Sequence, residues 1–95
     1  MNVMSAEVAV VLKVLPTEPG ADLDELAEKI KSRLPPQYQL VSYEKEPIAF
    51  GLEALRLLVF MPEDQVGGTS DLEEIIKGVE GVSEVDILMV TRMTR

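Results

Sequence analysis

The sequence predicts an α+β fold in which four strands form one antiparallel sheet and two helices cover one of its faces. Segments with strand-like and helix-like periodicity follow one another in the order βαββαβ. The 95 residues suffice for only one hydrophobic core, so residues 1–95 are expected to form a single domain. Two βαβ-type halves that share an antiparallel hairpin fit together most economically in this sandwich, which is the ferredoxin-like or split-βαβ arrangement.

The first strand and the first helix have clear patterns. The side chains of residues Glu7 to Leu15 would alternate between two faces of a strand, and both faces are mostly apolar. This pattern predicts a central strand. Prolines and a glycine at 16–20 break it. Asp22 with Glu25 three residues later predicts a helix start. The buried stripe expected for this helix comprises Leu23, Leu26, Ile30 and Leu34, and Pro35-Pro36 ends it.

Two further strands follow the helix. Residues 38–45 are more polar than the first strand, which predicts an edge strand. Glu46-Pro47 begins a turn, and residues 52–61 form the third strand. Because side chains alternate along a strand, two sets face opposite sides of the sheet: Leu55, Leu57, Val59 and Met61 on one side, and Ala54, Arg56, Leu58 and Phe60 on the other.

The last third of the chain predicts a helix and a strand. Ser70 with Glu73 resembles a capping box, and the helix would bury Leu72, Ile75, Ile76 and Val79. The strand Val82 to Met93 would place Val85, Ile87 and Met89 on one face and Leu88, Val90 and Arg92 on the other. The helix-free face of the sheet would then carry Val11, Leu58, Phe60, Leu88 and Val90, and an uncovered apolar patch of this kind usually binds a partner.

The composition excludes several classes of function. The chain has no Cys and no His, so it cannot form a disulfide or a thiolate metal site and lacks the usual general base. We therefore expect no enzyme activity and no cofactor or metal. The net charge of −8 repels phosphate backbones, which favours a basic protein partner over nucleic acid. No apolar run could span a membrane and no basic N-terminal leader is present, which predicts a cytoplasmic protein.

One short segment is typical of a docking tip. Pro47 is expected to block strand pairing, and Phe50 lies beside Gly51 at the start of a strand. A Phe before a strand is also often a core residue, and that alternative stays open on sequence alone. The flexible glycine next to it favours presentation of the ring to a partner.

The C-terminal end differs in charge from the segment before it. Residues 62–86 are strongly acidic, whereas residues 87–95 contain Arg92 and Arg95 and no acid. A cation at the end of a strand can reach into a partner. The alternative is that both arginines merely solvate a chain end.

Other motifs have simpler explanations. Gly67-Gly68-Thr69-Ser70 opens a helix but lacks the Gly-Lys-Ser/Thr sequence of a P-loop and lies among acids, so we interpret it as a hinge and N-cap without a ligand. Acidic pairs at the helix starts are explained by capping and the helix dipole rather than by metal binding. The third strand lacks the signature of RNA-recognition sheets, although Phe60 and Tyr43 leave base stacking open as an alternative.

Three segments together resemble the archaeal elongation factor 1-beta family: Pro47 to Leu55, Gly67 to Glu74 and Glu80 to Met93. The resemblance covers essentially the whole chain, and Pro-Ile-Ala-Phe-Gly-Leu is its most specific motif. It implies a ferredoxin-like fold and a guanine-nucleotide exchange factor that promotes GDP release and GTP loading on the GTPase elongation factor 1-alpha. The main alternative is a ferredoxin-like regulatory domain that senses a small molecule, which would need a polar pocket.

The resemblance also assigns residues. Phe50 matches the family's aromatic docking residue in a Pro-x-x-Phe/Tyr-Gly motif, so Pro47, Phe50 and Gly51 are assigned to partner binding. Arg92 matches the near-terminal cation that approaches the Mg²⁺ site of the GTPase, where eukaryotic members carry Lys, and it is the residue expected to drive exchange. Arg95 extends past the usual end, is assigned to partner binding and is the other candidate for that cation.

Overall fold

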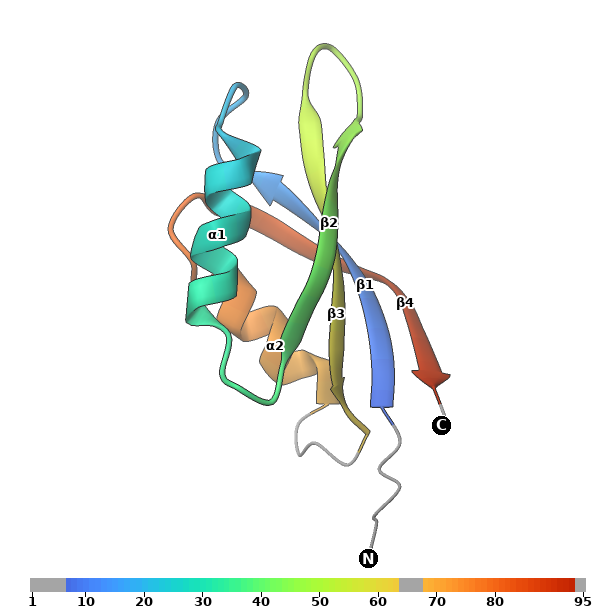
Figure 1. Ribbon diagram of the computed structural model, residues 1–95. Coiled ribbons are helices and arrows are strands. Elements are labelled where there is room, and N and C mark those ends of the chain that lie inside the picture. Colours follow the sequence, from blue (N-terminus) through green and yellow to red (C-terminus); the bar gives the residue numbers. More distant parts are fainter. Residues whose placement is uncertain (1–6, 64–67, 94–95) are drawn as a thin grey trace, which may run out of the picture.

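The computed structural model describes residues 7–63 and 68–93, and its elements follow the predicted order (Figure 1). The strands pair in the order β2-β3-β1-β4, every neighbouring pair is antiparallel, and both helices lie on the same side of the sheet. This is the predicted ferredoxin-like sandwich. Its elements are β1 (Glu7–Pro16), α1 (Leu23–Arg33), β2 (Gln39–Pro47), β3 (Glu53–Pro62), α2 (Gly68–Lys77) and β4 (Val82–Met93).

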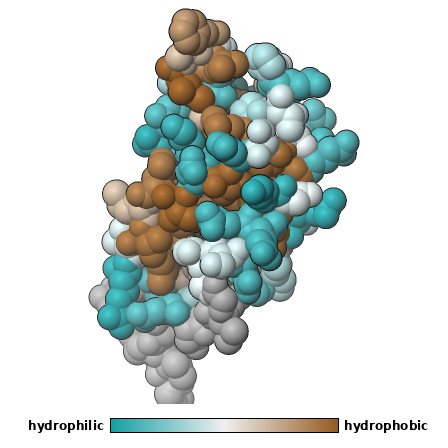
Figure 2. Space-filling view, turned by 180° about the vertical axis from the view of Figure 1, so that it is seen from behind, coloured by the Kyte–Doolittle hydropathy of each residue, from teal (hydrophilic) through white to brown (hydrophobic). Residues whose placement is uncertain are grey.

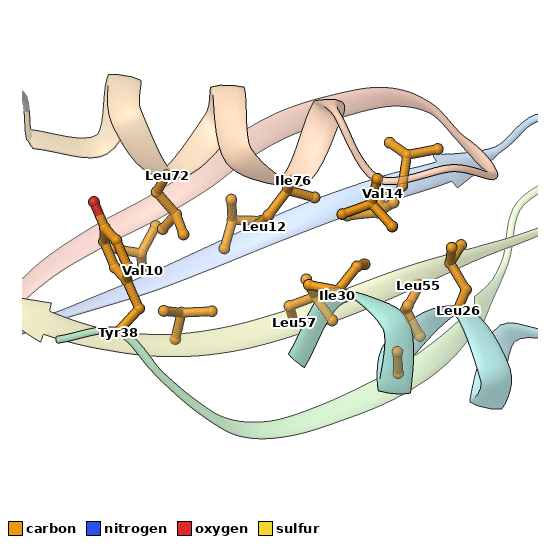
Figure 3. Close-up of a cluster of buried hydrophobic side chains, with 14 of the residues drawn as sticks. Val10, Leu12, Val14, Leu26, Ile30, Tyr38, Leu55, Leu57, Leu72 and Ile76 are labelled. Carbon is orange, nitrogen blue, oxygen red and sulfur yellow. The ribbon is translucent and has the colours of Figure 1, made fainter. Parts of the chain in front are cut away.

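The core lies between the central strands and the two helices. β1 and β3 each direct alternate apolar side chains toward the helices, and α1 and α2 close the layer with Ile30, Leu72 and Ile76 (Figure 3). Fully buried branched residues of this kind contribute most of the hydrophobic stabilisation of a small domain. The predicted inward face of β3 is confirmed. The buried residues of β1 and β3 that face the helices are Val10, Leu12, Val14, Leu55, Leu57, Val59 and Met61.

The sequence predicted the start of one helix correctly and that of the other incorrectly. Asp22 is the N-cap of α1, and its Oδ1 accepts a hydrogen bond from the Glu25 N–H at 3.1 Å, as predicted. The prediction of Ser70 as the N-cap of the second helix is wrong, because α2 already begins at Gly68 and Ser70 lies in its first turn.

The bounds of β2 also differ from the prediction. Tyr38 precedes the strand and packs in the core next to Val10 and Leu72 (Figure 3). At the other end β2 continues through Pro47, whose Cα pairs with that of Glu53. Proline is tolerated there because β2 is an edge strand that needs only one hydrogen-bonded neighbour. The hairpin between β2 and β3 is therefore longer than predicted, and its tip is tighter.

A β-bulge changes the faces of β4. Val11 pairs with Met89 but Leu12 pairs with Ile87, which leaves Leu88 as an extra residue. Paired residues in antiparallel strands point to the same side, so Met89 joins Val11 on the helix-free face, whereas Val90 and Arg92 follow Val10 and Val8 to the helix side. The predicted faces of Met89, Val90 and Arg92 are therefore wrong, because one inserted residue inverts the alternation beyond it.

The helix-free face consequently has two parts. The part beside the C-terminal end of β4 is apolar. The part nearer the hairpin is charged, because one row of paired residues across all four strands consists of Glu44, Arg56, Lys13 and Asp86. Figure 2 shows a brown band of apolar side chains across the molecule, with polar groups around it. The apolar part consists of Ala9, Val11, Leu58, Phe60 and Met89.

One polar cluster ties the edge strand β2 to α1. The Asp24 carboxylate accepts hydrogen bonds from the Lys45 ammonium and the Tyr43 hydroxyl, both at 3.0 Å. These two donors, Lys45 first, hold the pKa of Asp24 below its usual value. The cluster therefore connects pH to the attachment of β2.

Acid should weaken this attachment. Because the folded-state pKa of Asp24 is depressed, its stabilising contribution is present above the pKa of the unfolded chain and is lost as pH falls through the folded value. We expect Asp24→Asn to lower the melting temperature slightly at pH 7, and the difference from the unmodified protein to shrink as the pH falls below 3.8, the ordinary pKa of an Asp side chain. Thermal unfolding followed by circular dichroism at several pH values measures this. Glu28→Gln, on the next turn of α1, should show a smaller change, and an equal change would contradict the assignment.

Candidate functional site

The β2–β3 hairpin ends in a tight turn that presents Phe50. The Leu52 N–H donates to the Ala49 carbonyl at 2.9 Å, and the Ile48 N–H donates to the Leu52 carbonyl at 2.8 Å. Phe50 and Gly51 have φ values of 53° and 76°. Positive φ at both central residues is the requirement of a type I′ turn, the turn that matches the twist of a hairpin. Gly51 meets this requirement without strain.

Phe50 also adopts the positive φ that the turn requires, but at a cost in backbone strain. It is the one described non-glycine residue with positive φ, a region that costs an L-residue about 1–2 kcal/mol. Its side chain is 100% exposed, so no packing within the described chain compensates for the strain. The core alternative for Phe50 is therefore wrong. A strained, fully exposed aromatic residue is better explained by a contact with another molecule than by the stability of this one.

Arg92 lies at the opposite end of the molecule, near the end of β4. Its Nε lies 2.7 Å from Oε2 of Glu63, the residue that follows β3. The Arg92 side chain is 66% exposed and that of Glu63 is 37% exposed, so the pair is open to solvent and contributes little to stability. Glu63 therefore orients the guanidinium without burying it. Arg95 lies outside the described residues.

The structure does not bring Phe50 and Arg92 together. Arg92 pairs with Val8, which in turn pairs with Met61 near the far end of β3. The eight residue steps from Met61 back to Glu53 span about 26 Å at the usual strand rise. The hairpin and the C-terminal end accordingly lie at opposite ends of the sheet (Figure 1). A partner that contacts both must extend along the whole sheet.

Several contributors to these ends were not predicted. Ile48 and Leu52 flank Phe50 and are about 40% exposed, which makes the tip a small apolar surface rather than a single ring. Glu63 was not recognised as the neighbour of Arg92, because β1 lies between their strands. The bulge at Leu88 turns Arg92 to the side that Glu63 faces, and nothing in the local sequence marks that bulge.

Other chemistry has little support in the described residues. No group of three or more acidic side chains comes together there in a way that could hold a metal ion. Gly68 to Ser70 form the first turn of α2, and Gly67 lies outside the described residues. Within 7–63 and 68–93, neither helix is long enough to cross a bilayer.

Comparison with known proteins shows the family of the chain. Residues 9–93 match the family model described as the EF-1 guanine nucleotide exchange domain. The chain is 54% identical to elongation factor 1-beta of Hyperthermus butylicus, over 94% of this chain and 97% of that protein. It is 53% identical to elongation factor 1-beta of Thermofilum pendens, over 94% and 98%. For elongation factor 1-beta of Ignicoccus hospitalis the identity is 51%, over 97% and 98%.

Proposed function

Because the chain belongs to the EF-1 guanine nucleotide exchange domain family, we propose that it accelerates the release of GDP from elongation factor 1-alpha and so promotes loading of GTP. The observation that carries this proposal is the family match over residues 9–93, which includes both the hairpin tip and Arg92. Nucleotide exchange needs no nucleophile and no general base, which suits a chain without His or Cys. The family is one of exchange factors rather than of enzymes.

Arg92 is the proposed driver of release. In a nucleotide-bound GTPase, Mg²⁺ and the surrounding donors neutralise the phosphate charge and thereby hold the nucleotide. A guanidinium that enters this region competes for the same oxygen atoms and disturbs the coordination of the ion. The exposed position of Arg92 at a strand end allows it to enter, and its Nε is paired with Oε2 of Glu63 at 2.7 Å. Arg95 is the alternative cation for this role.

Phe50 is the proposed anchor, with Pro47 and Gly51 shaping the turn that carries it. An aromatic ring that is fully exposed in the free protein loses all of that apolar exposure when a partner pocket encloses it. The separation of the two ends implies that the GTPase offers two contact regions. One accepts Phe50, and the other, about a sheet length away, contains the nucleotide.

Exchange then follows from linkage. A factor that binds the nucleotide-free GTPase more tightly than the GDP-bound form must weaken GDP binding by the same factor. Anchoring by Phe50 contributes affinity for all forms of the GTPase, whereas Arg92 discriminates between them. The family match favours this function over the small-molecule sensor and over RNA binding.

The test is release of fluorescently labelled GDP from purified elongation factor 1-alpha, followed by stopped flow with excess unlabelled GTP. We expect the release rate to rise with the concentration of this protein and to level off at least about tenfold above the intrinsic rate, which corresponds to lowering the activation free energy of release by about 1.4 kcal/mol. An unrelated acidic protein of similar size is the control. An unchanged release rate at saturating concentration would reject the proposed function.

A further inference from the structure

A groove lies beside the hairpin tip, on the same end of the molecule as Phe50. It has a volume of about 320 Å³ and is formed by three segments: the end of β1 with the turn after it, the hairpin, and the start of β4. Most of its lining is apolar. The apolar residues are Leu15, Pro16, Pro19, Ile48 and Leu52.

Both walls of this hairpin groove are held in place before any partner binds. On one side, two prolines restrict the turn, and the Thr17 N–H donates to the Gly81 carbonyl at 3.0 Å. On the other side, the two backbone hydrogen bonds of the hairpin fix Ile48 and Leu52. A groove that is preformed avoids the entropic cost of ordering its walls on binding.

Two carboxylates give the hairpin groove a charge. Glu18 and Glu53 belong to its lining, both are exposed, and neither forms an ion pair within 4 Å in the part of the chain that the structure describes. The Lys45 ammonium is hydrogen-bonded to Asp24 at 3.0 Å, which is the main cause of its raised pKa, and the charge of Glu53 raises that pKa further without forming an ion pair. The groove thus combines an apolar floor with two carboxylates that form no salt bridge within the described residues.

This combination selects one kind of occupant. Lys and Arg side chains bury their methylene stems along apolar surface and keep the charged group at a polar rim. An acidic side chain or a phosphate would be repelled, and a purely aliphatic side chain would leave the carboxylates without a partner. Charge complementarity therefore points to a basic side chain.

We propose that the hairpin groove receives a Lys or Arg side chain of the partner GTPase, whose stem lies on the apolar floor and whose cation meets Glu18 and Glu53. The inference rests on the proposed function, because it assigns the groove to the same docking event as Phe50. The hairpin end of the molecule then makes two reciprocal contacts. Phe50 enters the partner, and a basic side chain of the partner enters the hairpin groove.

The experiment measures the concentration of this protein that gives half-maximal GDP release from elongation factor 1-alpha. For the double variant Glu18→Lys/Glu53→Lys we expect that concentration to rise about tenfold or more, with the same maximal rate, because a charged contact is replaced by repulsion. The neutral pair Glu18→Gln/Glu53→Gln should give a smaller rise and a weaker dependence on salt. Glu18 and Glu53 are exposed, so both double variants should fold, and thermal unfolding checks this.

The matched control is Glu28→Lys/Glu74→Lys, which makes the same charge change on exposed positions of α1 and α2. It should leave half-saturation close to that of the unmodified protein. If the unmodified chain accelerates GDP release but the groove variants behave like it or like the control, the inference alone is overturned. If the unmodified chain leaves GDP release unchanged, the proposed function fails and the inference fails with it.

Discussion

Replacing Arg92 by Ala should remove most of the acceleration of GDP release while leaving the docking of the protein largely intact. A charge-assisted hydrogen bond to a phosphate oxygen or a metal ligand contributes about 1.5–3 kcal/mol, so the maximal release rate should fall roughly 10- to 100-fold. The concentration for half-maximal release should change little, because Phe50, the proposed anchor, lies at the other end of the sheet. Stopped-flow titration separates the two quantities.

The stability of this variant should stay nearly unchanged. Arg92 is mostly exposed, and its ion pair with Glu63 is a surface pair of the kind that contributes about 0–1 kcal/mol. A matched control is Lys77→Ala, which removes an exposed cation from the end of α2 and should not affect release. Arg92→Lys should retain part of the acceleration, since it keeps the charge but loses the planar fork.

A full release rate with Arg92→Ala would reject the role of Arg92 and would leave Arg95 as the candidate cation. Loss of both the maximal rate and the half-saturating affinity would also matter, because it would show that Arg92 anchors the complex rather than acting on the nucleotide. Glu63→Gln adds a second readout. If Glu63 directs the guanidinium, this variant should lower the maximal rate by a smaller factor than Arg92→Ala and leave half-saturation unchanged.

The layers of this fold were predictable because most local signals agree with one another. β1 alternates with two apolar sides and lies in the centre of the sheet, and Asp22 caps α1 as its spacing with Glu25 predicts. The inward residues of β3 follow a strict period of two with no interruption in its pairing with β1. Where a single period holds over a whole element, the sequence is sufficient to assign its faces.

The arrangement of β4 was not predictable for a physical reason. A bulge adds one residue to a strand without any required residue type, and every side chain after it changes face. Leu88 is an ordinary strand residue, and the insertion is revealed only because Val11 pairs with Met89 while Leu12 pairs with Ile87. The contact between Arg92 and Glu63 has a similar origin, since it joins strands separated by β1, about 10 Å apart at the usual strand spacing.

The tip of the hairpin was predictable in kind but not in detail. Phe beside Gly indicated an exposed ring, and the ring is exposed. The positive φ of Phe50 was not indicated, because type I′ turns usually carry Asn, Asp or Gly at that position. The family resemblance assigned a docking role to Phe50, and the backbone strain gives that assignment an independent physical argument.

Replacing Phe50 should therefore change docking and stability in opposite directions. A central aromatic anchor of an interface typically contributes 2 kcal/mol or more, so for Phe50→Ala and Phe50→Asn the half-saturating concentration should rise about 30-fold or more. Asn tolerates positive φ, so Phe50→Asn should also raise the free energy of unfolding, by up to about 1 kcal/mol. The maximal rate of GDP release should stay close to that of the unmodified protein, since Arg92 is intact.

Docking and stability measured together are more informative than either measurement alone. A core residue loses stability and activity together when it is replaced, whereas a residue kept for a partner loses only binding, and Phe50→Asn distinguishes these cases in one protein. Phe50→Tyr is the matched control, since it retains the ring and should retain docking. If Phe50→Asn unfolds at a lower temperature than the unmodified protein, the ring makes stabilising contacts within the chain. If it reaches half-saturation at the unmodified concentration, the strain at Phe50 has no partner to explain it, and the hairpin is not the anchor.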